Sequence, residues 1–271
     1  MKQEINNAPN KFADVPIRVK TWVYIIVAFA IGLSHPFAMT ILVAWIAFQS
    51  CFEILRMFEV KTNKIALAVF VGFSQLLLFH FLTSDVYFLY SSGIAILIIA
   101  YFLINKVTLK QISGICFALM LCYYIFPHLA LLRATTFGVK ALIFLVVVTE
   151  LNDVFQYLMG KFFGKNKITP IISPNKTWEG FVGGVFLTVI LSIILGSFLL
   201  PSCFLTNSVI GLTLGVLGFF GDVFMSYLKR KTNVKDTGTL LPGHGGLLDR
   251  MDSLVFNTPV FFWIAPLLLT L

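Results

Sequence analysis

Cations, glycines and carboxylates are packed together between residues 226 and 252. These residues are Lys229, Arg230, Lys235, Asp236, Gly243, Gly245, Gly246, Asp249, Arg250 and Asp252. Clustered Lys and Arg side chains suit the oxygens of a polyphosphate, and glycines let backbone N–H groups approach it. Carboxylate oxygens beside phosphate favour Mg²⁺. The segment therefore predicts a phosphate and metal site. Its lone His244 either donates to a bound phosphate or only fixes the glycine turn.

Asp222 ends a row of small residues. Gly211, Gly215, Gly218 and Asp222 follow at spacings that share one helical face. Close helix packing accounts for the glycines, but a carboxylate at the end of such a groove needs a partner, and a cation is the simplest. Asp249 lies three residues before a further carboxylate, so one helical turn would direct both the same way. We predict Asp222, Asp249 and Asp252 as metal ligands.

A second basic stretch lies between residues 161 and 180. Lys176 stands beside Ser173 and Thr177, either of which can cap a helix that begins near residue 178. A helix N-terminus with a neighbouring lysine is an anion site. Ser173, Lys176 and Thr177 are therefore predicted to bind substrate, and capping without ligand contact is the alternative.

The elements that must position these side chains are apolar. The 271 residues are 58% hydrophobic and 12% charged, whereas soluble domains carry about 25% charged residues. Apolar runs of about 20 residues predict membrane-spanning helices. We expect an all-α, polytopic transmembrane bundle of about nine helices, at 22–34, 36–55, 64–83, 86–104, 111–131, 136–160, 178–200, 206–228 and 253–271. The first two could instead form one kinked or re-entrant element.

The basic residues indicate the orientation of this bundle. With the N-terminus in the cytoplasm, only Arg133 and Lys140 of the twenty Lys and Arg residues fall on the other side. The positive-inside rule therefore places the basic loops in the cytoplasm and predicts an integral protein of the cell (inner) membrane. The net charge of +8 then reflects topology and contact with anionic lipid. No basic helix or aromatic ladder indicates a nucleic-acid partner.

Acidic residues in apolar spans tend to mark function, and most of them lie in the second half of the chain. Glu150, Asp153 and Asp222 are examples, whereas only Asp85 comes close in the first half. We therefore expect residues 1–140 to be a transmembrane scaffold and residues 141–271 to be the catalytic region of one membrane domain, with its site at the cytoplasmic side.

The segment from Ser226 to Asp252 resembles the signature of the phosphatidate cytidylyltransferases, also called CDP-diacylglycerol synthases. It matches their Ser-x-hydrophobic-Lys-Arg, Lys-Asp, Pro-x-His-Gly-Gly and Asp-Arg-x-Asp pattern. The block from residue 173 to residue 180 and the Gly221-Asp222 pair are also similar. The resemblance covers about residues 150 to 257 and implies a dimeric enzyme that converts CTP and phosphatidate into CDP-diacylglycerol and pyrophosphate.

The resemblance also implies Mg²⁺ and a monovalent cation such as K⁺ as cofactors. Catalytic roles are predicted for the charged residues of the signature and for Asp222, and substrate binding for the neighbouring polar positions. The catalytic set is Asp222, Lys229, Arg230, Lys235, Asp236, His244, Asp249 and Arg250; the substrate-binding set is Asp153, Ser173, Lys176, Thr177, Ser226, Gly245 and Gly246.

Two positions depart from the family pattern. Met225 stands where the family usually has a Glu, and Asn152 stands where it has a small residue. These departures leave the lipid acceptor and the metal arrangement open. The alternative functions are a CTP-dependent lipid kinase of the polyprenol or phytol type and an inactive membrane homologue. A transporter would require two repeated halves with broken helices, and the sequence contains no repeat.

Overall fold

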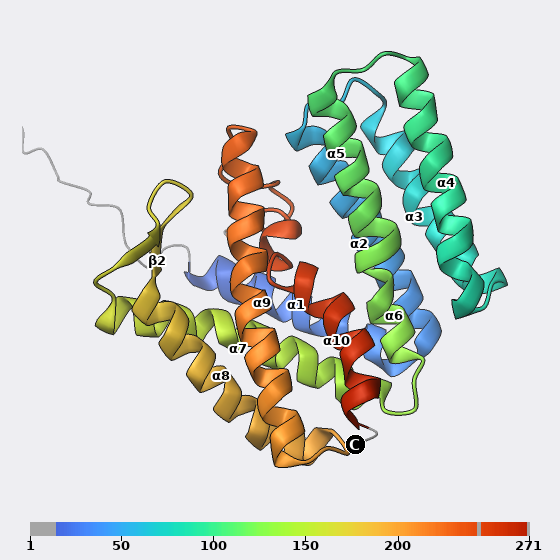
Figure 1. Ribbon diagram of the computed structural model, residues 1–271. Helices are drawn as coiled ribbons and strands as arrows, with labels where there is room; N and C mark the ends of the chain where they lie inside the picture. Colours follow the sequence, from blue (N-terminus) through green and yellow to red (C-terminus); the bar gives the residue numbers. More distant parts are fainter. Residues whose placement is uncertain (1–14, 243–244, 270–271) are drawn as a thin grey trace, which may run out of the picture.

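The computed structural model describes residues 15–242 and 245–269, and most of them lie in helices (Figure 1). Apolar segments become helices in a bilayer because only internal hydrogen bonds can satisfy their backbone groups. The elements are α1 (Val15–Ser34), α2 (Pro36–Met57), α3 (Lys64–Phe81), α4 (Ser84–Ile104), α5 (Leu109–Met120), η1 (Leu121–Ile125), α6 (Pro127–Arg133), α7 (Gly138–Phe163), β1 (Lys167–Thr169), β2 (Ser173–Thr177), α8 (Trp178–Leu199), α9 (Phe204–Lys231), η2 (Leu248–Arg250) and α10 (Leu254–Leu269).

The predicted all-α, polytopic bundle is confirmed. Each of the nine predicted ranges corresponds to one helical rod, because α5, the π-helical turn η1 and α6 follow one another over residues 109–133. Within the described ranges, six rods are long and apolar enough to cross a membrane: α2, α3, α4, the rod over residues 109–133, α8 and α9. α7 is not among the six.

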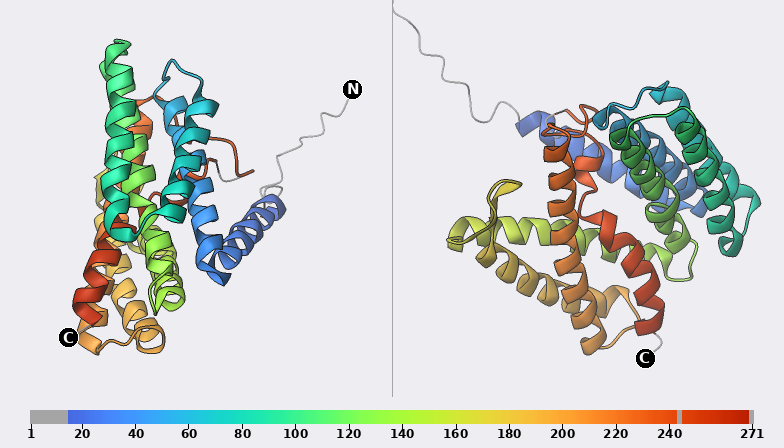
Figure 2. Two further views of the ribbon diagram at one scale, coloured as in Figure 1. Left: turned by 90° about the vertical axis from the view of Figure 1, so that its right-hand side faces the viewer. Right: turned by 45° about the horizontal axis from the view of Figure 1, so that its top comes forward.

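The run from residue 22 to residue 52 forms two helices. His35 adopts an extended backbone between them, and its Nδ1 accepts a hydrogen bond from the Phe37 backbone N–H at 3.1 Å. Pro36 occupies the first turn of α2, where its missing N–H costs nothing. Figure 2 shows α1 leaving the end of α2 at an angle, so the cap and the proline separate these elements.

The N-terminal half is organised around α2, which packs against α1, α3, α5 and α6. Its inward face carries apolar side chains, of which Val43, Ala47 and Ile54 are completely buried. Polar atoms inside this half pair with one another: the Ser74 and Tyr123 hydroxyls lie 2.6 Å apart. The loops after α2 and α4 meet at one end of the bundle, where Lys110 and Glu59 form an ion pair of 3.2 Å (Figure 1).

The C-terminal half places α7, α8 and α9 against one another, with α7 crossing α9 (Figure 2). Glycines allow this close approach. A Cβ at Gly211 would lie 2.5 Å from the Cβ of Ser192 on α8, and one at Gly218 would lie 3.0 Å from Nδ2 of Asn152 on α7. The packing interpretation of the glycine row is therefore correct, and the same helix carries Asp222 to the end of the bundle.

A two-stranded antiparallel hairpin interrupts the helices between α7 and α8. β1 pairs with β2 so that Lys167 faces Thr177 and Thr169 faces Ser173. No strands are predicted here from the sequence. Of the two candidate caps of α8, Ser173 is not the cap, because it begins β2. Thr177 is the cap instead: its hydroxyl accepts a hydrogen bond from the Gly180 N–H at 3.1 Å.

Candidate active site at the end of α9

The predicted site residues come from four segments that meet near the C-terminal end of α9. These segments are the part of α7 that crosses α9, the strand β2, the last turns of α9 and the loop that leads through η2 to α10 (Figure 1). The segments of α7 and α9 belong to long helices, and β2 lies between α7 and α8. Hydrogen bonds described below hold the loop. Two groups of charged side chains result, which we call the pocket centre and the loop centre.

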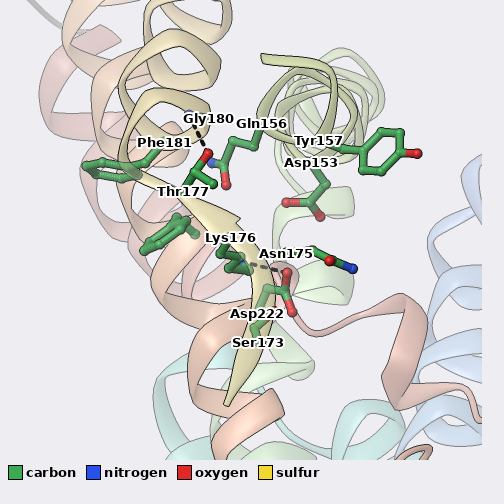
Figure 3. A pocket seen from close by; sticks show the side chains of 11 residues that line it. Asp153, Gln156, Tyr157, Ser173, Asn175, Lys176, Thr177, Gly180, Phe181 and Asp222 are labelled. Atoms are coloured by element: carbon green, nitrogen blue, oxygen red, sulfur yellow. Dashed lines mark hydrogen bonds and ion pairs between the residues drawn. The ribbon is translucent and has the colours of Figure 1, made fainter. Parts of the chain in front are cut away.

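The pocket centre consists of Asp153, Lys176, Asp222 and Asp252. Lys176 on β2 forms an ion pair of 2.7 Å with Asp222 on α9, and its ammonium also lies 4.3 Å from the centre of the Phe219 ring. Figure 3 shows Asp153 directed from α7 toward this pair. Asp153, Lys176 and Asp222 line a cavity of about 170 Å³, which Ser173 and Thr177 also border, and Asp252 lies close to these carboxylates. The cavity combines one cation with several carboxylate oxygens.

Negative charge in the pocket centre exceeds what its single lysine can balance. The pKa of Asp252 is raised well above its usual range, because the carboxyl group is removed from water and faces Asp222 and Asp153, although Lys229 opposes the shift. Among the described residues, the donors to the other two carboxylates besides Lys176 are hydroxyl groups: Ser253 donates to Asp153 at 2.7 Å, and Ser226 to Asp222 at 3.3 Å. Such an oxygen-rich site is suited to a cation.

The loop centre consists of Glu53, Lys229, Thr237 and Asp249, and its central carboxylate is fully paired. Oδ1 of Asp249 accepts from the Lys229 ammonium at 2.8 Å. Oδ2 accepts from the backbone N–H groups of Thr237 at 2.8 Å and Gly246 at 2.9 Å, and from the Thr237 hydroxyl at 3.2 Å. The side chain of Asp249 is 4% exposed, so this pair is an internal clamp between α9 and the loop.

Glu53 is a site residue that the sequence analysis missed. It lies on α2, is 1% exposed and bonds to the loop nearly 200 residues away. The expectation that the first half offers only Asp85 as an acid near an apolar span is therefore wrong. The available signal was an acidic residue inside an apolar run, which is costly unless paired or functional.

The glycines shape the loop. Gly245 has a φ of +88°, and a Cβ there would lie 2.6 Å from Oδ2 of Asp249. Its N–H donates to the Leu241 carbonyl at 3.0 Å, while the Gly246 N–H donates to Asp249. Both N–H groups are thus used within the protein, and substrate binding by Gly245 and Gly246 stays a prediction. His244 lies outside the described residues.

The remaining predicted residues surround the two centres. Arg230 is exposed and donates to the Ile172 carbonyl at 3.4 Å and the Val234 carbonyl at 3.3 Å, which ties the hairpin to the end of α9. Lys235 and Asp236 are exposed on the loop. Arg250 is partly buried in η2. The cations predicted to hold phosphate thus lie around the loop, and no observation assigns them a ligand.

The predicted metal ligands are divided between the two centres. Asp222 and Asp252 belong to the pocket centre, whereas Asp249 holds Lys229 and backbone N–H groups. Within the described part of the chain, no three His, Cys, Asp or Glu side chains are arranged to hold one metal ion. The three-ligand assignment stays a prediction, and Asp249 would have to exchange its present partners to fulfil it.

Both departures from the family pattern face the protein interior. Met225 is completely buried in the hydrophobic core. Asn152, also completely buried, accepts from the Thr188 hydroxyl at 2.9 Å and donates to the Gly215 carbonyl at 3.4 Å. Its amide therefore joins α7 to α8 and α9, and neither residue lines the cavity described above.

Comparison with known proteins agrees with this geometry. The model of the cytidylyltransferase family matches residues 16–268. The "Uncharacterized protein YnbB" of Escherichia coli (strain K12) is 52% identical over 126 residues, which cover 46% of this chain and 42% of that protein.

Two relatives carry the name phosphatidate cytidylyltransferase. The Helicobacter pylori (strain ATCC 700392 / 26695) protein is 44% identical over 121 residues, covering 45% of each chain. The Bacillus subtilis (strain 168) protein is 42% identical over 132 residues, covering 48% of this chain and 49% of that one. The chain spans about half the length of the curated relatives it matches. The family match covers nearly all of it, and the chain therefore belongs to the cytidylyltransferase family.

Proposed function

We propose that this protein transfers a cytidylyl group from CTP to phosphatidate, or to a closely related lipid phosphate, and forms CDP-diacylglycerol and pyrophosphate. One observation supports it most: an oxygen-rich pocket around Lys176 and Asp222 lies beside a basic, glycine-containing loop at the end of apolar helices. Family membership and the names of two relatives agree with this activity.

In the proposed reaction, an oxygen of the lipid phosphate attacks the α-phosphorus of CTP. A new P–O bond joins the two phosphates, the bond between the α-phosphorus and the oxygen bridging to the β-phosphorus breaks, and pyrophosphate leaves. The nucleophile is already an anion, so no strong base is required, and catalysis rests on positioning and charge neutralisation.

The side chains divide this work. We assign the triphosphate to the cations at the end of α9 and on the loop, Lys229, Arg230 and Lys235, with His244 as a further donor. Lys176 on β2 lines the pocket. It is assigned to the lipid phosphate, because its ammonium is the cation of that cavity. Ser173 and Ser226 can donate hydroxyl hydrogen bonds to the same oxygens.

The pocket centre fits Mg²⁺, because it combines hard carboxylate oxygens with too few cations. Asp222 and Asp252 are the ligands that we assign first, with Asp153 close by, and Asp249 remains a predicted ligand. Mg²⁺ bound there would neutralise charge that develops on the reacting phosphates. A monovalent cation such as K⁺ is proposed only from the resemblance to the family.

The helices and the charges also support a location. Six rods can cross a membrane, which suits a lipid substrate whose phosphate lies at the bilayer surface. We propose a cell (inner) membrane protein with the N-terminus and the site in the cytoplasm, because the basic residues crowd the loops at that face. A homodimer is proposed from the resemblance, and light scattering of the purified protein in detergent would test it.

Pyrophosphate release by purified protein in detergent tests the activity. The complete reaction contains CTP, Mg²⁺ and phosphatidate; matched reactions omit the lipid or replace it with diacylglycerol or polyprenol. Release that requires a lipid phosphate, together with a CDP-lipid product, is the expected result. Phosphorylated alcohol without pyrophosphate would instead identify a lipid kinase, and no release by folded protein with any lipid phosphate would contradict the proposal.

A further inference from the structure

Glu53 is an acidic residue inside an apolar helix. It lies in α2, which is long and apolar enough to span a membrane, and it is 1% exposed. A carboxylate in such a position is costly unless its oxygens are fully hydrogen bonded. Its partners therefore indicate what the residue does.

Among the described residues, four groups donate hydrogen bonds to Glu53; all are neutral, and three belong to the loop between α9 and α10. Oε1 accepts from the Leu247 N–H and from Nε2 of Gln49, both at 2.8 Å. Oε2 accepts from the Leu248 N–H at 3.1 Å and from the Thr237 hydroxyl at 2.7 Å. The two N–H groups stand where η2 begins, so the carboxylate caps the turn that carries Asp249.

The contacts continue from Glu53 into the loop centre. The Thr237 hydroxyl lies 2.7 Å from Oε2 of Glu53 and 3.2 Å from Oδ2 of Asp249. The other oxygen of Asp249 holds Lys229. Gly246 lies against the same groups, because a Cβ there would collide with the Thr237 hydroxyl and with Glu53. A continuous set of short contacts thus runs from α2 to α9.

We propose that Glu53 is a positioning residue, which fixes the described part of the loop between α9 and α10 and thereby the geometry of Lys229 and Asp249. The N-terminal half then does more than support the bundle, since it supplies the anchor of the loop assigned to the triphosphate. The expected effect on catalysis rests on the proposed function, whereas the anchoring of the loop by Glu53 does not.

Glu53→Gln is the sharpest test, because it keeps size and removes one acceptor. Whichever side the new NH₂ group takes, it faces a backbone N–H of Leu247 or Leu248, which then loses its partner. We expect kcat to fall about tenfold or more. The Michaelis constant for the lipid should stay within about twofold, because Glu53 does not touch the pocket around Lys176.

A second readout needs no activity. Lys235 lies exposed on the loop and Lys165 lies exposed before the hairpin, so mass spectrometry can follow tryptic cleavage at both in the full-length protein. We expect Glu53→Gln to raise the ratio of cleavage after Lys235 to cleavage after Lys165 several-fold. An unchanged ratio would overturn the proposal, even if activity falls.

Gln75→Leu is the matched control. Gln75 is also completely buried in an apolar helix, and its Nε2 donates to the Cys122 carbonyl at 3.0 Å, far from the loop. We expect this variant to change neither kcat nor the cleavage ratio. If it reproduces both effects, general destabilisation explains them and the positioning role is wrong.

Thr237→Val replaces Glu53→Gln if the latter does not fold, since it removes the donor shared by the two carboxylates with little change in volume. It should show the same two effects. Where both single variants fold, the double variant should be less affected than the product of the single changes. Independent, multiplicative effects would contradict the proposed contact. If wild-type protein is inactive with every lipid phosphate, the proposed function fails while the cleavage ratio still decides this inference.

Discussion

The loop centre and the pocket centre use the same residue types for different purposes. In the loop centre every oxygen of Asp249 has a donor, and Glu53 likewise meets four donors. In the pocket centre Asp222 pairs with Lys176, and Asp153, Asp222 and Asp252 each meet a serine hydroxyl or backbone N–H. A satisfied carboxylate holds structure, whereas an undercompensated group of carboxylates holds a cation or a cationic ligand. Four substitutions test this division.

Asp249→Asn should have the largest effect, because Asp249 both positions Lys229 and stabilises the loop. It leaves the Lys229 ammonium buried without its anion, and breaking a buried ion pair costs about 3–5 kcal/mol. We expect turnover to fall below detection and the thermal midpoint in detergent to fall as well. The sequence alone predicts lost turnover with an intact fold, so an unchanged midpoint would favour a pure metal-ligand role over the clamp.

Asp222→Asn should abolish activity without loosening the protein. Its ion pair with Lys176 is partly open to water, with side-chain exposures of 14% for the lysine and 29% for the aspartate, so the cost in stability should stay below about 1 kcal/mol. Activity should fall about a hundredfold or more, because a charged group at the reacting phosphates is lost. Higher Mg²⁺ should recover part of it; near-normal activity would remove Asp222 from the site.

Lys176→Met should give an intermediate effect. The substitution removes the cation of the cavity and keeps an apolar stem against Phe219. We expect the Michaelis constant for the lipid phosphate to rise about tenfold or more, with a smaller change for CTP. Steady-state kinetics with each substrate varied in turn provides the measurement. A larger rise of the Michaelis constant for CTP would indicate that the pocket binds the triphosphate and the loop binds the lipid phosphate.

Asn152→Leu should affect stability more than chemistry. Its amide links three helices and does not line the cavity, so its loss should cost about 1–3 kcal/mol. The preference among lipid phosphates should not change, as measured by product formation from phosphatidate and a second lipid phosphate in competition. A shifted preference would indicate that Asn152 helps to select the lipid acceptor.

The helices could be predicted because each is a long apolar run, and a chain with so few charges has little alternative in a bilayer. The hairpin could not, because Ser173–Thr177 contains Pro174, Asn175 and Lys176, which are poor strand formers. The strand β2 instead packs against α7 and ends at Thr177, the cap of α8.

The site was predictable to the extent that its residues are neighbours in the sequence. Asp249, Lys229 and the glycines share one segment, so their common purpose is visible without a structure. Glu53 is separated from Leu247 by 194 positions, and only folding brings them together. The division of the three predicted metal ligands between two centres was equally hidden, since spacing gives the direction of a side chain and not its partner.

The most direct measurement of the central claim follows the label from CTP into lipid. Wild-type protein and Asp222→Asn are incubated with phosphatidate, Mg²⁺ and CTP labelled at either the α- or the γ-phosphate, and the lipid is extracted. We expect label in the lipid only from the α-phosphate, only with wild-type protein and only when the lipid carries a phosphate. Label from the γ-phosphate, or equal labelling by Asp222→Asn, would contradict it.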